Sequence, residues 1–187
     1  EAQAKVGQAV VDQLKVYLEK DMVVNGVNVP AIMPESFLKL GKLLDLSEKM
    51  ASMLAQTIKE PLRSIHITFS EALSKEDQKA LKASALVGAL RPMCQDSINF
   101  VNAELQAQKR DMDSSITSYE GERDYKHWLK IELQSSNQSY AIEGALMGKS
   151  QLKIVSWNGY ALEIEPKGHM LIIENQDQPG NLAAWAA

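Results

Sequence analysis

The hydrophobic pattern changes its period along the chain, from a helical spacing in the first part to an alternating spacing later. Apolar residues recur every third or fourth position over residues 2–20 and 34–58, which predicts two amphipathic helices. Apolar and polar residues alternate over residues 62–69, which predicts a half-buried strand. Ser74 can then cap a third helix, rich in small residues, that extends to Leu90.

The second half of the chain is predicted to form mostly strands. A short strand over residues 97–101 and a helix over residues 103–110 come first. Further runs then predict five strands, over residues 114–119, 127–134, 140–147, 152–157 and 160–165. A more fully apolar run predicts a sixth strand over residues 169–173. Helices followed by an antiparallel meander indicate an α+β fold, in which helices pack on a mainly antiparallel mixed sheet.

Two turns stand out within the last forty residues. Asn158-Gly159 predicts a tight hairpin, because both central residues of a type I′ turn need positive φ. Residues 175–180 are predicted to form a polar turn before a helix start. Polar side chains and free N–H groups at a helix start suit a small anion or an amino acid. A plain strand-to-helix turn is the simpler explanation of the same residues.

Composition narrows the class of protein. The net charge is −4 without a basic block, which disfavours nucleic-acid binding. The single cysteine, Cys94, excludes an intrachain disulfide and favours a reducing, cytoplasmic compartment and a buried structural thiol. No apolar run reaches the roughly 20 residues that span a bilayer, so no membrane partner is expected. Both ends look cut, and we expect a piece of a longer polypeptide without a signal peptide.

Few residues suggest chemistry. The chain contains neither a GxGxxG motif nor a P-loop, and its three histidines are far apart in sequence. His66 lies on the polar side of its predicted strand and is interpreted as a surface histidine. Lys153 remains as a candidate anion contact, because it lies on the polar face of a strand beside the Asn-Gly turn. A solvated edge lysine is the simpler explanation.

Several segments, in order along the chain, resemble long-form D-3-phosphoglycerate dehydrogenases. They are NGVNVP (25–30), LGKL (40–43), ALVGAL (85–90), INFVNA (98–103), GALMG (144–148), KIVSWNGY (153–160), GHMLII (168–173) and NQDQPG (175–180). The resemblance implies three regions: the end of the catalytic part over residues 1–32, an intervening, allosteric-substrate-binding domain over residues 33–166, and the start of an ACT regulatory domain over residues 167–187.

The same resemblance implies what the chain does. The parent enzyme would oxidise 3-phosphoglycerate with NAD at the first step of L-serine biosynthesis. The family's catalytic residues and dinucleotide loop would precede Glu1, so this chain would hold no catalytic residue and no cofactor. It would instead be a regulatory and oligomerising region, with self-association to a tetramer. Its effector would be L-serine or a phosphorylated hydroxy or keto acid.

Individual positions also carry over by resemblance. Lys153 matches the family's anion-contact lysine, and Asn175 and Asp177 occupy the positions of effector-binding polar residues. Tyr160 and Glu165 stand where some relatives have arginines for the anion, and a carboxylate at close range repels phosphate by about 1 kcal/mol. The alternative interpretation of the whole chain is a stand-alone interaction or small-molecule-binding module without catalytic activity.

Overall fold

The computed structural model describes residues 2–20, 34–70, 72–148 and 150–174. Its helices are α1 (Ala2–Lys20), α2 (Pro34–Thr57), α3 (Lys75–Leu90) and α4 (Ala103–Gln108), with a 3₁₀ turn at Arg91–Met93. Its strands are β1 (Leu62–Phe69), β2 (Asp113–Ser118), β3 (Trp128–Ser135), β4 (Ser139–Met147), β5 (Gln151–Trp157) and β6 (Tyr160–Ile164). The strands form one sheet in the order β2-β1-β3-β4-β5-β6, antiparallel except between β1 and β2. The predicted α+β fold is confirmed.

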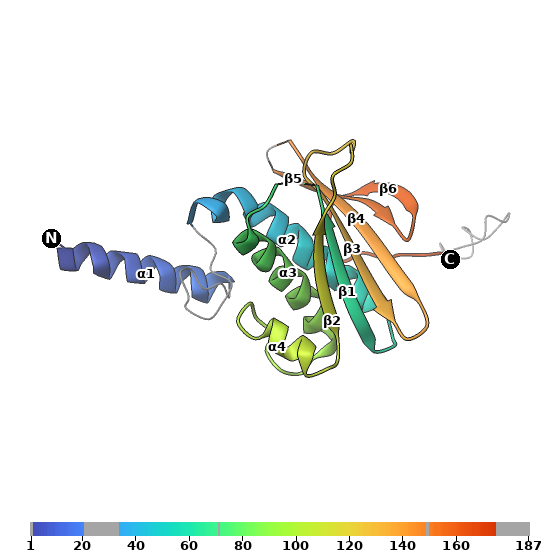
Figure 1. Ribbon diagram of the computed structural model, residues 1–187, viewed down its shortest axis with the longest axis horizontal. Helices are drawn as coiled ribbons and strands as arrows, with labels where there is room; N and C mark the ends of the chain where they lie inside the picture. Colours follow the sequence, from blue (N-terminus) through green and yellow to red (C-terminus); the bar gives the residue numbers. More distant parts are fainter. Residues whose placement is uncertain (1, 21–33, 71, 149, 175–187) are drawn as a thin grey trace.

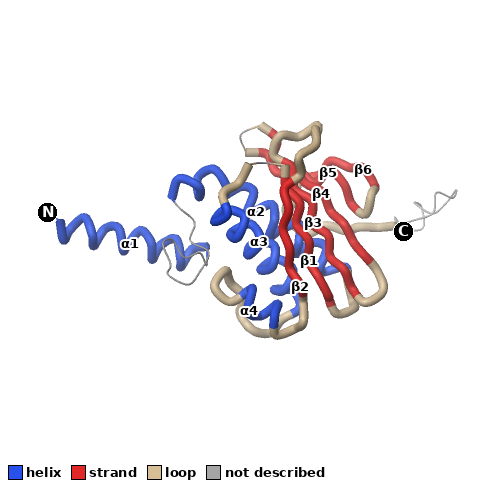
Figure 2. The backbone as a smooth tube through the Cα atoms, in the orientation of Figure 1, coloured by secondary structure: helices blue, strands red, loops and turns tan. Residues whose placement is uncertain are grey.

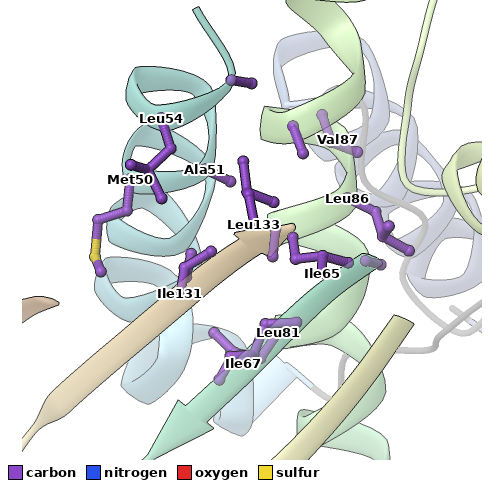
Figure 3. Packing of buried hydrophobic residues seen from close by; sticks show 14 of the residues in the cluster. Met50, Ala51, Leu54, Ile65, Ile67, Leu81, Leu86, Val87, Ile131 and Leu133 are labelled. Atoms are coloured by element: carbon purple, nitrogen blue, oxygen red, sulfur yellow. The ribbon is translucent and has the colours of Figure 1, made fainter. Parts of the chain in front are cut away.

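The helices α2, α3 and α4 lie on one face of the sheet, and no described helix covers the other face (Figures 1 and 2). Successive strand residues point to opposite faces, so Ile65 and Ile67 are buried under the helices while His66 between them is on the open face. Figure 3 shows the resulting core between α2, α3, β1 and β3. The sheet therefore has one covered face and one helix-free face.

The small residues of α3 allow it to pack closely against α2, as their number predicted. A Cβ added at Gly88 would lie 2.1 Å from the carbonyl oxygen of Glu48 on α2. The buried hydroxyl of Ser84 donates to the Leu44 carbonyl oxygen (2.6 Å), and Ser47 donates to the Leu81 carbonyl oxygen (3.4 Å). The two helices are thus joined through backbone atoms as well as through apolar side chains.

The strand predicted over residues 97–101 is wrong, because this segment is an irregular turn. The Asn99 carboxamide oxygen accepts from the backbone N–H groups of Val101 (3.0 Å) and Asn102 (3.1 Å). Asn102 accepts in return from the Asn99 N–H (2.9 Å), so its side chain points backwards and makes no capping bond to α4. The two asparagines offer the backbone local partners that replace those of a strand.

The strand predicted over residues 169–173 is also wrong. The segment after β6 is drawn as a loop in Figure 2, and no strand in the described part of the chain pairs with it. Leu171 has 83% of its surface exposed, and Met170, Ile172 and Ile173 are exposed as well. An apolar run becomes a strand only when another strand satisfies its backbone groups.

Candidate functional site

The β5–β6 hairpin positions the sequence-predicted lysine. Asn158 (φ 47°) and Gly159 (φ 87°) both have positive φ, which confirms the predicted tight turn. The Asn158 N–H donates to the Ala141 carbonyl oxygen (2.8 Å), and the Asn158 side-chain oxygen accepts from the Ala141 N–H (2.9 Å). These two bonds fasten the turn to β4, a role for Asn158 that the dipeptide pattern did not reveal.

Lys153 lies on β5 opposite Ala145 of β4, on the helix-free face of the sheet. Its ammonium group is 3.4 Å from the Glu163 carboxylate on β6. The Lys153 side chain is 19% exposed and that of Glu163 is 58% exposed. The lysine that the sequence marked for an anion is therefore paired with a carboxylate of its own hairpin, and that carboxylate is largely in solvent.

A second carboxylate lies next to this pair. Glu165 forms an ion pair with Lys167 (2.6 Å), and the hydrogen bond and charge of Lys167 hold the pKa of Glu165 below its ordinary value. The charge of Lys153 adds to the same shift. Tyr160, at the start of β6, is 68% exposed. The hairpin thus combines one half-buried lysine with two acidic side chains.

The two other residues predicted for the site, Asn175 and Asp177, lie outside the described residues. The segment that leads to them forms one wall of an open groove of about 280 Å³ along α2. Its lining residues are Glu48, Lys49, Ser52, Met53, Gln56, Pro166, Gly168 and Met170. Glu48 is already paired with Arg91, and Lys49 with Asp45, so both charges in the groove have partners within the fold.

A cluster on the helix-free face was not predicted from the sequence. The Arg123 guanidinium lies over the rings of Tyr119 (4.4 Å) and Trp128 (4.0 Å). The indole N–H of Trp128 donates to the Glu143 carboxylate (2.9 Å), which is 3.9 Å from Arg123. The arginine belongs to the loop between β2 and β3, where no periodicity applies. The signal available was an arginine between two aromatic residues in a polar loop.

His66 is half-buried on the same face. Its Nδ1 is 2.7 Å from the Ser115 hydroxyl, and its Nε2 is 3.1 Å from the Thr117 hydroxyl, both on β2. Within the described chain, no three histidine, cysteine, aspartate or glutamate side chains are grouped to hold a metal ion. Cys94, predicted to be buried, is half-buried against the edge of the core. None of the described helices is long and apolar enough to cross a bilayer.

Comparisons with known proteins show what the chain is similar to. The family described as the D-3-phosphoglycerate dehydrogenase intervening domain matches residues 39–158. The matched range contains most of α2 and continues through β5 to the hairpin turn. It therefore includes Lys153, the Arg123 cluster and His66.

Curated proteins named D-3-phosphoglycerate dehydrogenase are similar to nearly the whole chain. The protein of Methanocaldococcus jannaschii is 30% identical over 182 residues, which are 97% of this chain and 34% of the relative. Those of Archaeoglobus fulgidus and Bacillus subtilis are 27% and 24% identical, over 96% of this chain and 34% of each relative. The chain spans about a third of the length of these relatives.

Proposed function

Because the chain belongs to the family of D-3-phosphoglycerate dehydrogenase intervening domains, we propose that it is the regulatory and assembly region of an NAD-dependent D-3-phosphoglycerate dehydrogenase. Such an enzyme catalyses the first step of L-serine biosynthesis. The observation that carries the proposal is the family match over residues 39–158. The similarity of 96–97% of the chain to dehydrogenases three times as long supports it.

The proposal includes a division of labour along the polypeptide. Residues 1–32 end the catalytic region, residues 33–166 are the intervening domain, and residues 167–187 begin an ACT domain that responds to L-serine. The parent enzyme is a cytoplasmic homo-oligomer, a tetramer, and its NAD site lies outside this chain. The assignment of residues 1–32 is supported by the exposed apolar stripe of α1. Such a stripe would be buried if α1 packed against the rest of a larger domain. Its members are Val6, Val10, Val11, Leu14 and Leu18.

We also propose that Lys153 contacts a phosphorylated, substrate-like anion. The lysine is paired with Glu163, whose side chain is 58% exposed, so solvent screens the pair from the Glu163 side and the pair contributes on the order of 1 kcal/mol. A dianionic phosphate can therefore replace the carboxylate at small cost. The neighbouring Glu165 remains charged, because its pKa is lowered, and it opposes the incoming anion. We accordingly expect weak, salt-sensitive binding.

The function is tested with the longer gene product. We expect the full polypeptide to oxidise 3-phosphoglycerate with NAD. Removal of residues 33–187 should leave hydride transfer measurable while lowering the subunit number and abolishing any response to L-serine or to phosphorylated ligands. A full-length product without a dinucleotide motif and without dehydrogenase activity would exclude the proposal and favour a stand-alone interaction or ligand-binding module.

The anion contact is tested by calorimetric titration of this chain with 3-phosphoglycerate. Lys153→Met should abolish binding, because it removes the charge and keeps most of the side-chain volume. Glu163→Gln should tighten binding about threefold to tenfold, because it removes the competing carboxylate. Lys167→Met is the control for net charge and should change the affinity less than Lys153→Met. Equal affinity in the wild type and Lys153→Met would refute this assignment.

A further inference from the structure

The two edges of the sheet differ in how well they are protected against pairing with another strand. The β6 edge is five residues long, carries Glu163, follows a bulge in its pairing with β5, and leads directly into Glu165-Pro166. Short length, charge, irregular pairing and proline all discourage further strand addition. The β2 edge has no lysine, proline or bulge, and its only charged residue is Asp113 at one end.

The backbone groups on the outer side of β2 are available for a partner strand. The Tyr119 N–H donates to the Phe69 carbonyl oxygen (2.7 Å), so the odd-numbered residues of β2 direct their backbone groups towards β1. Backbone direction alternates along a strand, and Ser114, Ile116 and Ser118 therefore direct theirs towards the free edge. Among the described strands, none lies on that side of β2.

We propose that β2 pairs antiparallel with β2 of a second copy of this chain, about a two-fold axis at Ile116. A two-fold perpendicular to the sheet keeps each face on its own side, so Ile116 meets Ile116 and Ser115 meets Thr117 of the partner. Ser114 meets Ser118 in the same register, and Asp113 falls opposite Tyr119. In this register hydroxyl side chains pair with hydroxyl side chains, and no two like charges lie opposite each other. Such cross-strand pairs are favourable.

The helix that contacts β2, and the turn before it, carry two exposed apolar side chains. The helix α4 packs against β2, and Leu105 on α4 is 53% exposed. Val101, in the turn before α4, is 47% exposed. A strand pair alone covers less surface than a stable interface requires, so burial of these two side chains against the second copy supplies the hydrophobic part of the association. The result is one continuous sheet across two chains.

The contact is tested by disulfide cross-linking of the whole chain with Cys94 replaced by serine. In the proposed register the two Ile116 Cα atoms are about 5.5 Å apart, within disulfide range, so Ile116→Cys should give a covalent dimer under mild oxidation. Ser118→Cys is the matched control, because the two copies of position 118 would lie about 13 Å apart along the strands. We expect at least about tenfold faster cross-linking at position 116. Equal rates at both positions overturn the proposal.

Charged side chains introduced at positions 115 and 117 test the same register without oxidation. The double variant Ser115→Lys, Thr117→Lys places lysines opposite lysines and should raise the dimer dissociation constant at least about tenfold in sedimentation experiments. Ser115→Glu with Thr117→Lys places opposite charges together and should restore association. Tyr160→Lys with Ala161→Lys adds the same charge at the β6 edge and should leave association unchanged.

Sedimentation comparisons are made only after circular dichroism shows that each variant is folded. A β6 variant that dissociates the dimer as strongly as the β2 variant overturns the proposal, because it places the contact elsewhere. This inference deepens the assembly role proposed above. It fails separately from that role, because a longer enzyme can be a regulated dehydrogenase whichever surface joins its subunits.

Discussion

The two faces of the sheet are built from the same strands but have different physical characters. On the covered face, Ile65, Ile67 and Ile131 are fully buried beneath α2 and α3 (Figure 3). On the helix-free face, the neighbouring residues His66 and Glu132 are hydrogen-bonded or ion-paired and partly in water. One alternating sequence thus encodes a surface that stabilises the fold and a surface on which polar side chains can change with little effect on folding.

The difference is one of packing density. The covered face has no space for an added methyl group at Gly144. Its Cβ would lie 2.6 Å from the Met50 sulfur and 3.1 Å from the Lys153 carbonyl oxygen. Helix-free side chains such as Lys130 and Lys153 pair with glutamates that solvent also reaches. We therefore expect truncations and additions of single methyl groups to be costly on the first face. Charge changes should be inexpensive on the second face, except where the charged group accepts a hydrogen bond from a buried donor.

The sharpest test of this contrast is an adjacent pair of β3 residues. Ile131→Ala removes three buried carbon atoms between α2 and the sheet and should lower the free energy of unfolding by about 4 kcal/mol. Glu132→Ala, one residue further, should lower it by no more than about 0.5 kcal/mol. Urea unfolding followed by circular dichroism measures both. Similar losses for the two variants would contradict the assignment of faces.

The close approach of α2 and α3 gives the next largest effect. Gly88→Ala should destabilise the protein by about 2–3 kcal/mol, because the added methyl group overlaps the Glu48 carbonyl oxygen. Gly41→Ala on α2 is the matched control: nothing lies within 4 Å of its added Cβ, and it should stabilise the helix by about 0.5–1 kcal/mol. A Gly88→Ala protein as stable as the wild type would mean that the helices are further apart.

The covered face and the hairpin were predictable from the sequence, because they depend on local periodicity and on backbone preferences. Ile65 and Ile67 alternate with polar residues, and Asn158-Gly159 suits positive φ at both positions. The helices and the six strands of the sheet were predicted from such signals, together with two further strands that do not form. Two strand predictions were wrong. Near Asn99, side chains bind the backbone groups that a neighbouring strand would bind, and residues 169–173 have no partner among the described strands.

The candidate site was harder to predict because it depends on register. Glu163 reaches Lys153 across the β5–β6 pair, whose register shifts at a bulge between Ile154 and Ser156. A one-residue shift changes which side chains share a face, and the sequence contains no direct signal for it. The position of Arg123 over Tyr119 and Trp128 likewise depends on how a loop folds back on the sheet.

The Arg123 cluster allows a test of intermediate size on the helix-free face. Glu143→Ala leaves the nearly buried Trp128 indole N–H without its acceptor and should cost about 1–2 kcal/mol. Glu143→Gln keeps an acceptor and should cost about 0.5 kcal/mol or less. Chemical unfolding followed by tryptophan fluorescence gives both values. If the two variants lose the same stability, the charge contact to Arg123 rather than the indole hydrogen bond holds the loop.

The smallest effect is expected from the titration of Glu165, at the end of the hairpin. Its pKa in the folded protein is lowered by Lys167 and, to a lesser extent, by Lys153. A carboxyl group with a lower pKa in the folded than in the unfolded chain stabilises the fold above its ordinary value near 4.5. This stabilisation disappears as the pH falls from that value through the folded pKa. Glu165→Gln should therefore lower Tm slightly at pH 7 and by less at pH 3, and thermal unfolding at both pH values measures the difference. The Glu165 side chain is exposed to solvent, so only a small difference is expected. A large pH-dependent difference would show that exposed charges contribute as strongly as the buried core, contrary to the comparison of the two faces.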